Sequence, residues 1–187
     1  MKEKGSFGDS AAAHFLFRLI APGMESPLRR KFFDPVKALK GAGIRLGQEV
    51  LEVGCGTGFF TIPAAELVGD EGRVYALDSH PLAIERVAKK IRDAGLTNVR
   101  LIKADAIETA LASDCTDLVL LFGVIPSPTL PLARLLPEMH RLLKPEGALA
   151  VWTALPWWSP ASLTKRGLFV YVGKESGVHN FRKETSD

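Results

Sequence analysis

The sequence is poor in cysteine, with only Cys55 and Cys115 among its 187 residues. Two thiols are too few for a disulfide framework or for a zinc site built on cysteine. Each lies in an apolar, strand-like stretch, which favours a small buried side chain over a reactive one. Because reduced cysteines suit a reducing compartment, we expect a cytoplasmic protein.

The sequence also lacks long apolar runs and a strong net charge. No apolar run is long enough to cross a bilayer, which takes roughly 18 residues or more. The most apolar N-terminal piece, AAAHFLFRLIAP, contains His14 and Arg18 and does not fit a signal peptide. A net charge of +3 is too small to indicate a nucleic-acid-binding surface by itself. Composition therefore favours a globular domain of ordinary type.

From residue 47 onward, strand-like and helix-like segments alternate. This rhythm predicts an α/β fold whose parallel strands are covered by helices on both faces. The stretch 167–184 instead predicts an antiparallel hairpin around a turn at 174–177. Short apolar runs predict strands at 48–54, 72–78, 98–105, 116–123 and 148–155, with helices at 60–69, 81–95 and 131–147.

Residues 1–46 have a different pattern. Pro22-Gly23, Pro27 and Pro35 divide this region into two or three short pieces of helical character. We expect it to form an N-terminal helical cap within the same domain as residues 47–187.

Three glycines alternate in the stretch EVLEVGCGTGFF: Gly54, Gly56 and Gly58. They allow the main chain to approach a ligand without a Cβ between them. The dinucleotide fingerprint G-x-G-x-x-G would require glycine where Phe59 stands, and no phosphate-binding lysine follows. The loop therefore favours a nucleoside without a pyrophosphate. The alternative is a tight turn that binds no ligand. Three alternating glycines disfavour this alternative, because ordering each glycine costs conformational entropy.

Two carboxylates follow the next predicted strands. Asp78 ends the second strand, where it can accept hydrogen bonds from both hydroxyls of a ribose. Alternatively, it caps the helix that begins at Pro81, although Ser79 can serve there. Asp105 ends the third strand in the stretch KADA and can accept from the exocyclic amine of adenine. Taken alone, Asp105 is an ordinary loop acid.

In this order and spacing, the motifs resemble those of class I S-adenosylmethionine-dependent methyltransferases. The resemblance covers about residues 47 to 184 and rests on VLEVGCGTGFFT, VYALDSHPLAIE, IKADA, TDLVLLF and LPEMHRLLKPEGALAVWT. More narrowly, the chain is similar to the small ubiquinone- and menaquinone-biosynthesis-type enzymes of archaea and anaerobes, the methyltransferase type 11 group. The resemblance implies a Rossmann-like seven-stranded sheet of five parallel strands and a C-terminal antiparallel hairpin. It also implies that residues 47–187 bind S-adenosylmethionine.

The resemblance assigns the methionine and ribose parts of this cofactor to the first two motifs. Gly54, Gly56 and Gly58 would shape the loop beside the methionine part. Glu52 would hold that loop and reach the methionine ammonium through water. Asp78 would bind the ribose hydroxyls.

The remaining cofactor contacts are implied for residues after the second, third and fourth strands. Ser79 would flank the adenine, and Asp105 and Ala106 would line its edge. Phe122, with the glycine that follows it, would lie near the sulfonium. His80 directly follows the ribose-binding acid and its neighbour, so we expect it to contact the cofactor.

No catalytic base stands out in the sequence. Transfer of a methyl group from a sulfonium needs mainly alignment of the nucleophile behind the methyl. A base is needed only for a nucleophile that must lose a proton. His14, in the expected cap, is a weak candidate for a base or a substrate contact. His140 and His179 are expected to be structural or on the surface.

The acceptor is expected to be a small, apolar molecule. The loop FGVIPSPT lacks the Asn/Asp-Pro-Pro-aromatic motif with which many enzymes of the family hold a planar nitrogen. This absence argues against adenine or glutamine as the acceptor. No metal site is evident in the sequence. Trp152, Trp157 and Trp158 follow the fifth strand, where they either pack the cap onto the sheet or line a substrate pocket. The stretch PLRRKFF is a candidate for contact with an anionic membrane surface.

Two other functions remain open from the sequence. Without an evident base, one alternative is a non-catalytic binding module or partner subunit that keeps the cofactor fold. An RNA methyltransferase is suggested by the positive charge and by Arg29, Arg30 and Lys31, but no RNA-binding appendage is evident, so no nucleic-acid partner is expected. The sequence is compatible with a monomer or a homodimer.

Overall fold

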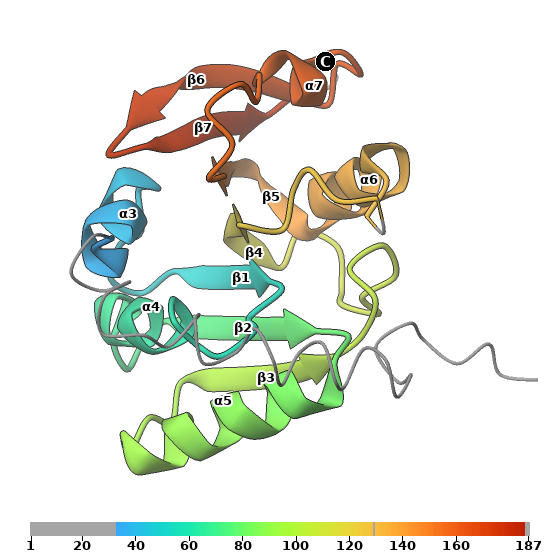
Figure 1. Ribbon diagram of the computed structural model, residues 1–187. Helices are drawn as coiled ribbons and strands as arrows, with labels where there is room; N and C mark the ends of the chain where they lie inside the picture. The colour runs from blue at the N-terminus through green and yellow to red at the C-terminus, as the bar shows by residue number, and fades with distance from the viewer. Residues whose placement is uncertain (1–32, 129, 186–187) are drawn as a thin grey trace, which may run out of the picture.

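A seven-stranded sheet forms the centre of the protein in the computed structural model, which describes residues 33–128 and 130–185. The strand order is β3-β2-β1-β4-β5-β7-β6 (Figure 1). The first five strands pair in parallel and the last two pair antiparallel, which confirms the predicted fold. The strands are β1 (Glu49–Val53), β2 (Arg73–Asp78), β3 (Val99–Lys103), β4 (Thr116–Phe122), β5 (Leu143–Trp152), β6 (Phe169–Glu175) and β7 (Val178–Lys183).

Helices cover both faces of the sheet because its strands carry apolar side chains alternately on each face. Leu51 and Val119 face α6 and α7, whereas Val50 and Leu118 belong to the cluster packed on α3 and α4. Ala76 of β2 contacts the apolar side of α5. The helices are α3 (Pro35–Gly41), α4 (Thr61–Val68), α5 (Pro81–Asp93), α6 (Leu132–Leu142) and α7 (Ala161–Thr164).

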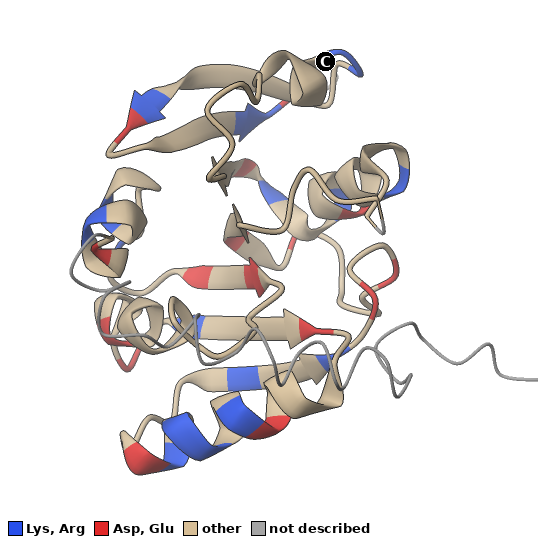
Figure 2. Ribbon diagram, viewed as in Figure 1, with Lys and Arg blue, Asp and Glu red and all other residues tan. Residues whose placement is uncertain are grey.

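The order of the strands determines where a ligand can bind. β1 pairs with β2 on one side and with β4 on the other, so the chain changes direction across the sheet at β1. A crevice forms at such a switch point, outside the carboxyl ends of the strands. Figure 2 shows acidic residues near the carboxyl ends of β1 and β2, which are Glu52 and Asp78.

Several elements differ from the sequence prediction. The hairpin turn is tighter than 174–177, because the strands continue to Glu175 and resume at Val178. The two connecting residues, Ser176 and Gly177, have positive φ angles of 48° and 84°. Such dihedrals are typical of the two-residue turns that match strand twist. β5 spans Leu143–Trp152, with a register shift opposite β4, so residues 143–147 are strand where helix was predicted and the strand ends before 155. β3 ends at Lys103, two residues before Asp105, and the four-residue α7 was not predicted.

Of the expected N-terminal cap, residues 33–46 lie within the described part of the chain, and they contain α3. Its carbonyl at Gly41 accepts a hydrogen bond from Asn180 Nδ2 at 2.8 Å, which joins α3 to β7. The ring of Phe33 lies 4.5 Å from that of Trp152 at the end of β5. Within the described part of the chain, no helix has the length and apolar character needed to cross a bilayer.

Leu120 tests how strongly the centre of the sheet stabilises the fold. It lies in β4 and has no exposed surface. We expect Leu120→Ala to lower the free energy of unfolding by about 2–5 kcal/mol, because a cavity replaces buried methyl groups. Urea denaturation measures this change.

Leu46 provides the control, because it is 77% exposed. We expect Leu46→Ala to change the free energy of unfolding by less than about 0.5 kcal/mol. Equal losses of stability in the two variants would contradict this description of the core.

Candidate functional site

The loop after β1 is held close to β2 and to the loop after β4. Gly54 has a φ angle of +73°, and its N–H and that of Cys55 both donate to the Leu77 carbonyl, at 2.8 and 3.0 Å. A Cβ at Gly54 would lie 2.4 Å from Val124 Cγ1. Both the dihedral and the close approach therefore require glycine at this position.

The Asp78 carboxylate connects this loop to the end of β2. Its Oδ2 accepts a hydrogen bond from the Gly56 N–H at 2.9 Å, and its Oδ1 accepts from the His80 N–H at 2.8 Å. Burial raises the pKa of Asp78 above its ordinary value, and the two backbone hydrogen bonds oppose that rise. Each carboxylate oxygen retains acceptor capacity for a ligand hydroxyl.

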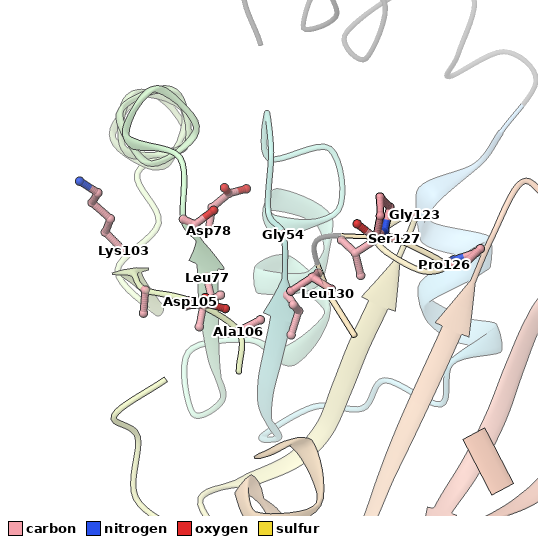
Figure 3. Close-up of a pocket in the computed structure, with 15 residues that line it drawn as sticks. Gly54, Leu77, Asp78, Lys103, Asp105, Ala106, Gly123, Pro126, Ser127 and Leu130 are labelled. Atoms are coloured by element: carbon pink, nitrogen blue, oxygen red, sulfur yellow. The ribbon is translucent and has the colours of Figure 1, made fainter. Parts of the chain in front are cut away.

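A cavity of about 700 Å³ opens at the carboxyl ends of the central strands. Figure 3 shows Asp78 and Lys103 on one side of it, and Gly123, Pro126 and Ser127 on the other. Its walls combine two carboxylates and a lysine with many apolar groups. The lining residues are Val53, Gly54, Leu77, Asp78, Ser79, Lys103, Ala104, Asp105, Ala106, Gly123, Val124, Pro126, Ser127, Pro128 and Leu130.

The structure brings five of the predicted site residues to the wall of this cavity: Gly54, Asp78, Ser79, Asp105 and Ala106. The glycine after Phe122 joins them. The other predicted residues within the described part of the chain lie behind or beside the wall, namely Glu52, Gly56, Gly58, His80 and Phe122. The weak catalytic candidate His14 lies outside the described residues.

Several of the residues outside the wall support neighbouring elements. A Cβ at Gly58 would lie 3.3 Å from Val87 Cγ2, so this glycine lets α5 approach the loop. His80 Nδ1 accepts from the Leu82 N–H at 3.2 Å and thereby caps α5, a role that the sequence allowed for Ser79. The ring of Phe122 packs edge-on against that of Phe60, at 4.9 Å between centroids.

Glu52 is buried beneath the glycine loop, with 2% of its surface exposed. Its Oε2 accepts a hydrogen bond from Thr61 Oγ1 at 2.5 Å. Burial raises the pKa of Glu52 to about 8, and the nearby charge of Asp78 adds to this rise. The Glu52 side chain is therefore mostly protonated at neutral pH.

The loop that carries Asp105 is attached to α6 by a contact that was not predicted from the sequence. Thr109 donates to Glu138 Oε1 from its N–H at 3.0 Å and from its Oγ1 at 2.6 Å. Arg141 donates to both oxygens of the same carboxylate, each at 2.8 Å. The hydrogen bond from Arg141 has the largest effect on the pKa of Glu138. Together with those from Thr109, it lowers this pKa to about 2. Glu138 thus anchors the loop, while Asp105 Oδ1 accepts from the Ile107 N–H at 3.1 Å.

Much of the wall formed after β3 and β4 was also not predicted from the sequence. Lys103 lies in the stretch IKADA but was given no role there, and the position of Leu130 follows from loop shape rather than from a motif. The general rule that ligands bind outside the carboxyl ends of strands was a usable signal for the loop 123–130. The lining residues missed in that loop are Val124, Pro126, Ser127, Pro128 and Leu130.

Comparison with known proteins identifies the family. A family model described as "Methyltransferase domain" matches residues 44–166, well over half of the chain. The chain belongs to the methyltransferase-domain family. Every residue that lines the cavity falls inside the matched part of this methyltransferase domain.

Relatives of the methyltransferase domain include two demethylmenaquinone methyltransferases. The protein from Geobacillus stearothermophilus is 36% identical over 110 residues, which are 58% of this chain and 46% of that protein. The protein from Lactobacillus johnsonii is 32% identical over 135 residues, which are 71% of this chain and 52% of that protein. The matched part thus spans about half the length of these relatives.

Solved structures share the fold of the methyltransferase domain. A SAM-dependent methyltransferase from Aquifex aeolicus has a TM-score of 0.74 and 24% identity, covering 87% of this chain and 95% of that one. The PH0226 protein from Pyrococcus horikoshii has a TM-score of 0.71 and 14% identity, covering 91% of this chain and 98% of that one. At these identities the likeness concerns the fold.

The buried Glu52 makes stability depend on pH. Its pKa is about 8 in the folded protein and has an ordinary value of 4.5, so the unfolded chain loses this proton first as pH rises. The stability contributed by protonated Glu52 is fully present below the lower pKa. This stability is lost as pH rises from the pKa of the unfolded chain to that of the folded protein. The loss in the free energy of unfolding is on the order of a few kcal/mol. Glu52→Gln stays neutral, so its stability relative to wild type should increase with pH across this window.

Denaturant titrations at several pH values measure this trend, with Glu66→Gln as the control. Glu66 is an exposed glutamate of the neighbouring α4, so this variant should follow the wild type at each pH. A constant difference between Glu52→Gln and wild type would mean that Glu52 ionises in the folded protein as it does in the unfolded chain.

Proposed function

We propose that the protein is an S-adenosylmethionine-dependent methyltransferase that acts on a small, apolar molecule. The observation that carries this proposal is the position of Asp78: it ends β2, lines the cavity and is bonded to the glycine loop. Membership of the methyltransferase-domain family supports the same interpretation. S-adenosylmethionine, when bound, supplies a methyl group activated on a sulfonium.

The residues of the cavity fit an adenosine. Asp78 offers carboxylate oxygens for the two ribose hydroxyls, and apolar side chains form surfaces for the faces of a purine ring. Asp105 lies in the same wall and offers an acceptor for an exocyclic amine. The cavity volume of about 700 Å³ lies within the range of cofactor sites. The apolar lining side chains include Leu77, Ala104, Ala106 and Leu130.

We infer a supporting role for the predicted cofactor residues that do not line the cavity. Gly56 holds the Asp78 carboxylate through its N–H, and Gly58 allows α5 to approach. Glu52 supports the loop from below through Thr61. His80 holds the other oxygen of Asp78 through its backbone and caps α5.

Phe122 directly precedes Gly123, where the methionine part would lie.

The catalytic demand on the side chains is modest. An in-line transfer requires that the acceptor atom lies behind the methyl group and that water is excluded. The names of the two bacterial relatives support a quinone-type acceptor, which agrees with an apolar substrate. We also propose that residues 1–46 cap the domain formed by 47–187, supported by the contacts of α3 with β7 and with α4.

Cofactor binding is the first test. Calorimetry with S-adenosylmethionine and S-adenosylhomocysteine should detect binding to the wild type. Asp78→Ala should weaken it by about 10- to 100-fold, because hydrogen bonds from a ligand to a charged group are lost. Asp93→Ala, a change at an exposed aspartate of α5 paired with Lys89, should leave affinity unchanged. Absence of binding at millimolar ligand, or equal affinity in Asp78→Ala and wild type, would overturn the proposal.

Methyl transfer is the second part of this test. Incubation with methyl-labelled S-adenosylmethionine and a cell extract should yield a labelled small molecule that mass spectrometry can identify. Cofactor binding without transfer to any extract component would instead favour a binding module. Labelled RNA as the product would favour the RNA methyltransferase.

A further inference from the structure

A second, smaller cavity of about 380 Å³ lies between the end of β5 and the β6–β7 hairpin. None of its lining residues belongs to the wall of the first cavity. The chain at and just after the end of β5 forms one side, and the hairpin forms the other. The lining residues are Trp152, Thr153, Ala154, Leu155, Pro156, Trp158, Lys174, Gly177 and His179.

Trp152 lies between a glycine of the first cavity and a glycine of the second. A Cβ at Gly123, which lines the first cavity, would lie 3.7 Å from Trp152 Cζ3. A Cβ at Gly177, which lines the second, would lie 3.9 Å from Trp152 Cδ1 and Nε1. The Gly123 N–H also donates to the Trp152 carbonyl at 2.8 Å. Trp152 therefore lines the second cavity and packs next to Gly123, which lines the first.

The second cavity has aromatic walls. The rings of Trp158 and His179 meet edge to face, 5.2 Å apart at an angle of 68°. Together with Trp152, they present aromatic rings to a small volume, an arrangement that suits another planar ring. Trp157 directly precedes Trp158 but is 77% exposed and does not line the cavity. Of the two roles expected for these tryptophans, Trp158 lines a pocket. Trp152 lines the pocket and also packs on Phe33.

His179 and Lys174 add a polar end to this cavity. The two residues are opposite each other in the β6–β7 pairing. His179 Nδ1 lies 3.1 Å from Tyr171 Oη, which fixes the orientation of the imidazole. The second ring nitrogen, Nε2, provides further hydrogen-bonding capacity. Burial, followed by the charge of Lys174, lowers the pKa of His179 and so favours the neutral ring.

We propose that the second cavity binds a planar aromatic ring that carries a hydroxyl or carbonyl oxygen. The ring packs against Trp152 and Trp158, and its oxygen lies at the polar end formed by His179 and Lys174. Resting on the proposed function, this ring is the methyl acceptor, held beside the Gly123 end of the cofactor cavity. The second cavity would then select the acceptor, and the first would hold the donor.

Binding of 2-naphthol, a fused-ring aromatic alcohol, tests this proposal. Ligand-observed NMR titration should show saturable binding to the wild type. Trp158→Ala should raise the dissociation constant at least about tenfold. Trp157→Ala, the matched change at the exposed neighbour, should alter it less than about twofold.

His179→Phe keeps an aromatic ring but loses the hydrogen bond, so it should weaken binding of 2-naphthol more than that of 2-methylnaphthalene.

The titrations are repeated with saturating S-adenosylhomocysteine, and thermal unfolding confirms that each variant is folded. Binding of 2-naphthol that persists with S-adenosylhomocysteine bound supports a separate second site. Competition between the two ligands would place 2-naphthol in the first cavity and overturn the proposal. So would absence of 2-naphthol binding at millimolar concentration, or equal affinity in Trp158→Ala and Trp157→Ala.

The same experiment separates this inference from the proposed function. If S-adenosylhomocysteine does not bind but 2-naphthol binds with the expected dependence on Trp158, the second site stands and the methyltransferase proposal fails. If S-adenosylhomocysteine binds and the Trp158 change has no effect on 2-naphthol, the cofactor site stands and the aromatic subsite is wrong.

Discussion

The hydrogen bonds that the Asp78 carboxylate accepts from Gly56 and His80 are the constraint on which the site depends. They hold the glycine loop of β1 against the start of α5, at the switch point where β1 lies between β2 and β4. Burying a carboxylate costs desolvation, and here the backbone N–H groups offset part of that cost. The same group that organises the loop is therefore presented to a ligand with acceptor capacity remaining.

Side chains that do not line the cavity hold the loops around this contact in place. Glu52 lies below the loop, bonded to Thr61, and Glu138 anchors the loop after β3 to α6. Neither Glu52 nor Glu138 lines the cavity, yet each fixes a segment that does. At the end of β5, Trp152 lies next to Gly123 of the first cavity and lines the second cavity. The end of β5 therefore lines the proposed acceptor site and is hydrogen-bonded to Gly123 in the wall of the proposed donor site.

Sequence patterns predicted most of this fold because the central strands are buried on both faces and so are almost wholly apolar. Asp78 and Asp105 were predicted because they lie at or just beyond the ends of strands, and strand ends fix where a side chain lies. Gly123 was predicted, but the lining residues after it and the contact of Glu138 were not, because tertiary contacts determine loop conformation. The hairpin turn was placed too broadly, since Lys174 and Glu175 look like turn residues but pair with β7.

The central claim is that the cavity at the ends of β1 to β4 holds S-adenosylmethionine. Its most direct test is a titration of isotope-labelled protein with S-adenosylhomocysteine, followed by the backbone amide signals in NMR spectra. We predict that the signals of Gly54, Ser79, Ala106 and Gly123 shift together with one dissociation constant. Unchanged signals at these residues under millimolar ligand, or shifts confined to other parts of the sheet, would contradict it.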